Sequence, residues 1–238
     1  MLWLQGWDAA PELAAACAQT WRQCNPGWEL RLLAEPDLAA LIGDDAGVRA
    51  IAGKQLPPDA YSDVVRMALL VHHGGVWADA TTYCLRSLDD WLPPMLASGF
   101  FAFTNVDPDR KIASWFLAAA PGAQLLEIWQ AYVVAYWRRL ARRHTHFWFH
   151  GALFSQAYRE NRTFRAIWKA TPTLSSRDPA QLSQRLGVPL PPSDLAAIRA
   201  SGVPLLKLRY RRGDGPFGPE SAYRRLVDLA FGRAEPPE

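Results

Sequence analysis

Ser62-Asp63-Val64-Val65-Arg66 and, shortly after it, Gly74-Gly75-Val76-Trp77-Ala78-Asp79-Ala80-Thr81 form the stretch of sequence that decides the fold. The apolar spacing around Asp63 and Arg66 predicts a helix over 59–73, and residues three apart in a helix share one face. The two glycines are expected to end this helix, and the three residues after them to form a buried strand. Ligands of open α/β sheets bind at the carboxyl ends of strands, so the stretch predicts a binding site at Asp79.

The paired residue types indicate what such a site would bind. A carboxylate accepts hydrogen bonds from sugar hydroxyls, and a guanidinium donates a planar fork to oxygen acceptors. The alternative is that Asp63 and Arg66 form only a surface ion pair, which contributes under about 1 kcal/mol, and that the two glycines only stop the helix. The ordered combination of these elements within twenty residues favours a binding site for a polar, sugar-like ligand.

The rest of the chain predicts strands alternating with helices, followed by a mainly helical part. Strands are expected at 2–4, 28–32, 100–104, 112–118 and 203–210, and helices at 11–23, 36–42, 122–143, 146–169 and 220–231. The spacing of the first strands and helix predicts a parallel sheet with crossover helices, and therefore the α/β class. We expect a single domain over 1–238, with a nucleotide-sugar-binding core over about 1–120 and a mainly helical acceptor-side part over 121–238.

Composition limits the class of protein and its compartment. Half of the 238 residues are hydrophobic, as in a globular protein, and a net charge of +3 is too small for a typical nucleic-acid-binding protein. The three cysteines, Cys17, Cys24 and Cys84, show neither a disulfide framework nor zinc-binding spacing, which favours a reducing compartment. We find no signal peptide and no membrane-spanning segment, so a cytoplasmic protein is expected.

The central stretch resembles the capsular polysaccharide synthesis family of bacterial glycosyltransferases, which is related to sugar transferases with an Asp-x-Asp (DXD) motif. Further similar blocks lie at 3–8, 25–29, 88–91, 112–116, 147–150 and 207–210, so the resemblance covers nearly the whole chain. It implies a GT-A-like fold, in which a Rossmann-like mixed sheet that binds the nucleotide sugar is flanked by helices, with helical additions at the C-terminus.

The resemblance also implies an activity. The chain is expected to transfer a hexose from a nucleotide-diphosphate sugar to a glycan or lipid-linked acceptor in cell-surface polysaccharide synthesis, with retention of configuration. The basic run at 137–143 either contacts the inner membrane at its cytoplasmic face or is only a solvated helix end. The rival function is a non-catalytic nucleotide- or glycan-binding module on a degenerate transferase fold. A hydrolase is disfavoured because no nucleophile elbow and no carboxylate pair is present.

Site residues follow from the resemblance position by position. Trp3 matches an aromatic residue that stacks on the nucleotide base, although a core role is equally compatible with its strand. Asp63 and Arg66 match a pair that binds the donor sugar. Asp79 matches the first carboxylate of the DXD motif, and Ser114 matches a residue that faces the donor sugar.

The chain departs from the DXD pattern at Thr81, which stands where the second Asp would be. The resemblance implies a divalent cation, Mn²⁺ or Mg²⁺, at Asp79, and a hydroxyl in place of a carboxylate predicts that this cation binds weakly. Lys207 and Arg211 are expected either to neutralise the donor diphosphate or to lie on a basic surface strand. His150 is expected either as a phosphate contact or metal ligand or as a buried core residue.

Overall fold

The computed structural model describes residues 1–104, 111–140, 149–209 and 215–233. The chain divides into two compact units, each assembled from segments that are separated in the sequence. The first unit comprises 1–33, 79–92 and 177–238, and the second comprises 34–78 and 93–176. Helices accompany small sheets in this structure, which confirms the predicted α/β class. The single domain with an internal boundary near residue 120 stays a prediction.

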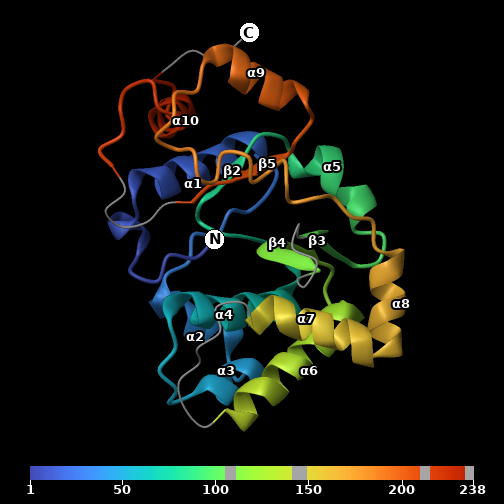
Figure 1. Ribbon diagram of the computed structural model, residues 1–238. Helices are drawn as coiled ribbons and strands as arrows, with labels where there is room; N and C mark the ends of the chain where they lie inside the picture. Colours follow the sequence, from blue (N-terminus) through green and yellow to red (C-terminus); the bar gives the residue numbers. More distant parts are fainter. Residues whose placement is uncertain (105–110, 141–148, 210–214, 234–238) are drawn as a thin grey trace. The chain divides into compact units, whose positions relative to one another are not determined.

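The second unit is built on a three-stranded antiparallel sheet in the order β1-β4-β3. Its strands are β1 (Gly75–Ala78), β3 (Phe100–Thr104) and β4 (Ile112–Ala119), and its helices are α2 (Glu35–Ile42), α3 (Ala46–Ile51), α4 (Pro58–His73), α6 (Gln124–Arg139), α7 (Phe149–Glu160) and α8 (Arg162–Ala170). Helices α4 and α7 pack on the sheet, and α6 contacts both (Figure 1). The expected helix over 59–73 and the strands β1, β3 and β4 are confirmed.

Aromatic side chains form the core of the second unit. The ring of Phe154 lies edge-on to Trp129, Phe164 and Trp168, with centroids 5.0, 4.8 and 5.0 Å away. Edge-to-face pairs at such distances contribute beyond their buried area. The abundance of tryptophan is therefore explained in part by packing, and Trp129 and Trp137 are fully buried.

The turn between α4 and β1 depends on Gly74. Its backbone has φ of 65°, and a side chain there would place a Cβ 2.8 Å from the backbone nitrogen of Pro121. Only glycine combines a positive φ with such a close approach of another backbone segment. Gly74 thus fixes how the helix that carries Asp63 and Arg66 leads into the strand that ends at Ala78.

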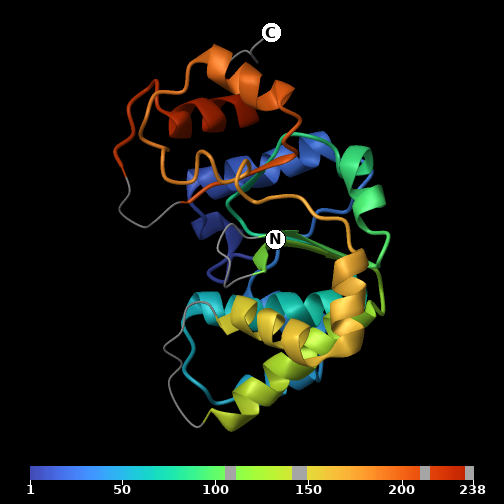
Figure 2. The same cartoon turned by 45° about the vertical axis from the view of Figure 1, so that its right-hand side comes forward.

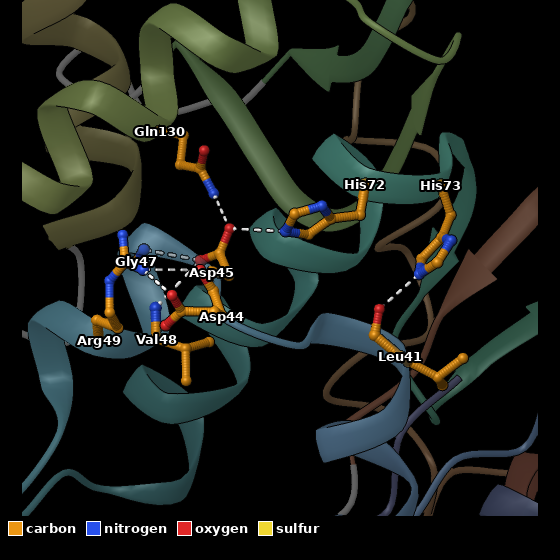
Figure 3. A network of polar contacts seen from close by, with 9 residues as sticks. All are labelled: Leu41, Asp44, Asp45, Gly47, Val48, Arg49, His72, His73 and Gln130. Atoms are coloured by element: carbon orange, nitrogen blue, oxygen red, sulfur yellow. Dashed lines mark hydrogen bonds and ion pairs between the residues drawn. The ribbon is translucent and has the colours of Figure 1, made fainter.

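A buried carboxylate ties α3, α4 and α6 together in the second unit (Figure 3). Asp45 is 3% exposed and caps α3 by accepting hydrogen bonds from the backbone N–H groups of Gly47 and Val48, at 2.7 and 3.1 Å. Its other oxygen lies 3.1 Å from Nε2 of His72 and accepts from Nε2 of Gln130 at 2.7 Å. The Asp45 carboxylate thus has hydrogen-bond partners from α3, α4 and α6, as a buried charge requires. A structural role is sufficient to explain this network.

The first unit contains a two-stranded antiparallel sheet, several α-helices and a short 3-10 helix at Trp7–Ala9. Strand β2 (Thr82–Cys84) pairs with β5 (Leu205–Lys207), and the α-helices include α1 (Glu12–Cys24), α9 (Pro192–Ala200) and α10 (Ala222–Ala230). Helix α1 packs along β2 and α10, as the blue and red helices in Figure 2 show. The indole of Trp21 in α1 donates to the carbonyl of Thr82 at 2.8 Å, which anchors the helix to the strand. Helix α5 (Leu88–Met95) crosses the boundary between the units.

The predicted parallel sheet is wrong. Both sheets among the described residues are antiparallel. The expected strand at 2–4 is reduced to a parallel bridge from Leu2 to Leu33, and residues 28–32 form neither a strand nor a bridge. The alternation at 28–32 suggested a strand, but Trp28 is 40% exposed, so the pattern does not mark a buried face. The order β1-β4-β3 instead follows from the antiparallel pairing of β3 with β4, which are consecutive in the chain.

Three other predicted elements have different bounds. The helix expected over 122–143 is α6, which ends at Arg139, and residues 141–143 and 146–148 of the expected helices lie outside the described residues. The single helix expected over 146–169 is divided into α7 and α8, because Asn161 leaves the helix and caps α8 by accepting from the N–H of Phe164 at 2.9 Å. The strand expected over 203–210 is confirmed only as β5, and its last residue lies outside the part of the chain that is described. No helix in the described ranges is long and apolar enough to span a membrane.

Candidate functional site

Asp63 and Arg66 form a buried ion pair on α4. Nη1 of Arg66 lies 3.1 Å from Oδ1 of Asp63, and their side chains are only 7% and 11% exposed. The alternative of a surface pair is therefore excluded. Removing two charges from water is costly and is offset only by good geometry and further hydrogen bonds. The burial of this pair therefore raises the question of what else holds it.

Arg66 makes further contacts in the second unit. Its Nη1 donates to the backbone carbonyl of Ser114 in β4 at 2.5 Å, and its Nη2 donates to Oγ of Ser62 at 3.3 Å. The guanidinium carbon lies 5.1 Å from the ring centroid of Trp77, within the range of a cation–π contact. The planar group is thus fixed in orientation by a helix and two strands, as a residue that recognises oxygen acceptors requires.

His150 adjoins the same pair. Its Nδ1 lies 3.4 Å from Oδ1 of Asp63, and its ring stacks on Trp129 with centroids 4.2 Å apart. Burial lowers the pKa of His150 below its ordinary value, against the opposing effect of the Asp63 charge. The expectation of a buried histidine agrees with its 1% exposure. The roles of phosphate contact and metal ligand stay predictions.

A pH-dependent stability follows from this pKa. Because the folded pKa of His150 is depressed, its neutral form stabilises the fold fully above pH of about 6.5, and that contribution is lost as the pH falls below this value towards the folded pKa. We expect the free energy of unfolding to fall more steeply between pH 7.5 and 5 in the wild type than in His150→Gln. Urea denaturation at several pH values measures both curves, and parallel curves would contradict the assignment.

A second polar cluster lies in the first unit, where Lys207 of β5 meets the turn before β2. Nζ of Lys207 donates to Oδ2 of Asp79 at 2.8 Å and to Oγ1 of Thr81 at 3.0 Å. The side chains of Lys207 and Asp79 are 22% and 26% exposed, so the cluster is half-buried and in part reached by solvent. The Asp79-Ala80-Thr81 motif is therefore in contact with a lysine that comes from the far end of the sequence.

The residues around Asp79 do not fit a divalent cation held by the protein. A cation bound by Asp79 and Thr81 would need the oxygens to which the Lys207 ammonium donates, and two positive charges there would repel each other. Within the described ranges, no group of three or more His, Cys, Asp or Glu residues is placed to hold a metal. The cation at Asp79 therefore stays a prediction from the resemblance.

The structure places the other predicted residues as follows. Trp3 lies in the first unit and is half-buried, and its backbone N–H donates to the carbonyl of Leu33 at 2.9 Å. Ser114 meets Arg66 through its backbone carbonyl, and its side chain is half-buried. Arg211 lies outside the described residues.

The contacts of Arg66 and His150 include residues for which no role was predicted. Ser62 could have been found, because it lies one helical turn before Arg66. Trp77 belongs to the conspicuous Gly-Gly-Val-Trp run, but the sequence did not indicate that its ring would face a guanidinium. Trp129 carried no signal, because nothing in the sequence relates α6 to His150.

A family model matches most of the chain. The family model described as capsular polysaccharide synthesis protein matches residues 1–224, which bears out the resemblance. A solved structure named PaToxG Glycosyltransferase is similar with a TM-score of 0.46 at 10% identity, covering 71% of each chain. That likeness is too remote to support an argument about activity. The comparison with curated proteins gave no match.

Proposed function

Because this chain belongs to the capsular polysaccharide synthesis protein family, we propose that it is a glycosyltransferase acting in that synthesis. Its donor would be a nucleotide-diphosphate hexose and its acceptor a glycan or lipid-linked saccharide. The observation that carries the proposal is the buried, fully oriented Asp63–Arg66 pair in the stretch that first suggested a sugar site. Oriented carboxylate and guanidinium groups suit the hydroxyls and ring oxygens of a sugar.

The reaction breaks the bond between the anomeric carbon and the diphosphate oxygen, and forms a bond from that carbon to an acceptor hydroxyl oxygen. The hydroxyl proton leaves with the departing diphosphate or through solvent, and the bonding electrons stay on the diphosphate. We propose retention of configuration, with the leaving phosphate itself assisting the attack. Negative charge therefore develops on the diphosphate, and positive groups placed there would lower the barrier.

Each cluster has a separate role in this proposal. Asp63 and Arg66 would bind the donor sugar, with His150 supporting Asp63 from within the core. Asp79 would orient the donor, and Lys207 would act on the diphosphate. Contact with the cytoplasmic face of the membrane stays a prediction, because much of the basic run at 137–143 lies outside the described residues.

A non-catalytic binding module is the rival function. It is favoured by Thr81, which removes one carboxylate of the DXD pattern, and by the single bridge that stands in place of the first expected strand. Such a module would bind a nucleotide sugar without cleaving it. Hydrolysis or transfer at any measurable rate would eliminate this rival.

A thermal-shift screen against nucleotide sugars tests the binding part of the proposal. A ligand that binds only the folded state stabilises it by mass action and so raises the melting midpoint. At a ligand concentration one hundred times the dissociation constant, the stabilisation is about 2.7 kcal/mol. We expect one of the uridine, guanosine, thymidine or cytidine diphosphate sugars to raise the midpoint above the others. A protein that none of them stabilises would contradict a nucleotide-sugar donor.

Trp3 gives a test of base recognition. Trp3 is half-buried rather than fully enclosed, and we propose that its ring stacks on the base. We expect Trp3→Ala to weaken binding of the matching nucleoside diphosphate by about 1–3 kcal/mol, measured by calorimetry. Trp28→Ala, which removes an exposed tryptophan from the same unit, is the matched control. An unchanged dissociation constant in folded Trp3→Ala would remove Trp3 from the site.

A further inference from the structure

The Lys207 ammonium is anchored by two oxygens from a single turn. It donates to Asp79 at 2.8 Å and to Thr81 at 3.0 Å, and these are the first and third residues of the motif that usually carries two carboxylates. A lysine ammonium has three N–H donors. In the described part of the chain two of them have side-chain acceptors, which leaves one for a ligand oxygen.

The backbone fixes this position closely. The N–H of Thr82 donates to the carbonyl of Asp79 at 2.9 Å, which closes the turn of the motif. Lys207 stands opposite Thr82 in the antiparallel register, and the N–H of Leu208 donates to the carbonyl of Thr81 at 2.9 Å. On its other side, the N–H of Lys207 donates to the carbonyl of Pro179 at 2.8 Å. The lysine is therefore built into the motif by strand pairing rather than reaching it from a free loop.

The net charge of the cluster is close to zero, so it does not repel an anion such as a diphosphate. A carboxylate and an ammonium nearly cancel, whereas two carboxylates would require a divalent cation before a diphosphate could approach. Thr81 accounts for the difference, since its neutral hydroxyl accepts from the lysine without adding a charge. The loss of the second carboxylate and the presence of the lysine thus compensate each other.

We propose that the Lys207 ammonium replaces the divalent cation at this motif and neutralises the diphosphate of the donor directly. The inference rests on the proposed function for the identity of the ligand, and it implies that binding and transfer proceed without metal. Asp79 is then the residue that positions the ammonium, and Thr81 is suited to this arrangement rather than a defect of a metal site.

Binding of inorganic pyrophosphate in the presence of a chelator tests the proposal without knowledge of the base or sugar. Calorimetric titration is expected to show that wild type binds pyrophosphate in chelator, and that Lys207→Met weakens binding at least about tenfold, as for loss of a hydrogen bond to a charged group. Lys207→Arg, which keeps the charge, should lose less. Lys169→Met, which removes an exposed lysine from α8, is the matched control and should bind as the wild type does.

The reciprocal exchange gives a second readout. In the variant with Thr81→Asp and Lys207→Ala together, two carboxylates face the ligand without a lysine, so pyrophosphate binding should now require Mn²⁺ and be abolished by chelator. Direct titration with Mn²⁺ should also show tighter metal binding in this variant than in the wild type. Thermal melting confirms that each variant is folded.

The results separate this inference from the proposed function. Wild type that binds pyrophosphate only when Mn²⁺ is present, or Lys207→Met that binds it as well as wild type, would overturn the role of Lys207. The protein could instead bind pyrophosphate through Lys207 but cleave no nucleotide sugar. That result would support the anion site at Lys207 and contradict the proposed transferase activity.

Discussion

Turnover of the preferred donor should fall at least about 100-fold in Arg66→Lys, the loss typical of removing one oriented donor from an active site. Lysine keeps the charge that Asp63 requires but cannot reproduce the planar fork that reaches Asp63, Ser62 and the carbonyl of Ser114. Asp63→Asn keeps the shape of the carboxylate and removes its charge, and we expect a loss of similar size. Initial rates of nucleoside diphosphate release measure both variants.

A matched control separates the site from the effect of the substitution itself. Arg49 and Asp44 form an ion pair in the same unit, but their side chains are 54% and 79% exposed. Arg49→Lys should therefore leave turnover unchanged. Near-normal turnover in both folded Arg66→Lys and Asp63→Asn would show that the buried pair is structural.

The same pair predicts a large effect on stability. Arg66→Met would leave the Asp63 carboxylate buried without its cation, which costs about 3–5 kcal/mol in the free energy of unfolding. For this reason the activity test uses Arg66→Lys, in which the charge persists.

Asp79→Asn should also reduce turnover at least about 100-fold, but with a different kinetic signature. The substitution removes the charge that holds Nζ of Lys207 at 2.8 Å, so the ammonium is no longer fixed where the diphosphate charge develops. Because the charge removed is negative, affinity for the nucleoside diphosphate should not fall. Asp90→Asn changes an exposed residue of α5 and is the control.

A comparison of turnover with affinity decides between the two roles of Asp79. A positioning residue predicts that turnover falls while the dissociation constant of the nucleoside diphosphate is unchanged or smaller. If Asp79→Asn loses both turnover and affinity for the nucleoside diphosphate, and Mn²⁺ without chelator restores neither, Asp79 does not act by positioning Lys207.

Local features of the sequence predicted the first half of the site. Helix α4 follows from its apolar period, and its end from Gly74, whose positive φ and contact with Pro121 require glycine. The shared face of Asp63 and Arg66 follows from a spacing of three residues. These features depend on residues close together in the chain, so the spacing of residue types in the sequence predicts them.

The remaining contacts depend on pairings that no local pattern contains. Lys207 contacts Asp79, 128 residues away in the sequence, because β5 pairs with β2 in one register. The sequence of a short apolar strand does not indicate with which strand it pairs. The contact of His150 with Asp63 likewise depends on the packing of α7. The alternation at 28–32 predicted a strand that the structure does not contain. An alternating pattern becomes a strand only if another segment pairs with it, and the pattern does not show whether one does.

The release of nucleoside diphosphate from a panel of nucleotide sugars, with the sugar product quantified in parallel, tests the transferase most directly. We predict that one donor is cleaved by the wild type in chelator, with one sugar transferred or hydrolysed per diphosphate released, and that Arg66→Lys and Asp79→Asn lose this activity. Binding of a donor without any release of diphosphate, by folded protein supplied with saccharide acceptors and with Mn²⁺, would contradict a glycosyltransferase and show a binding module.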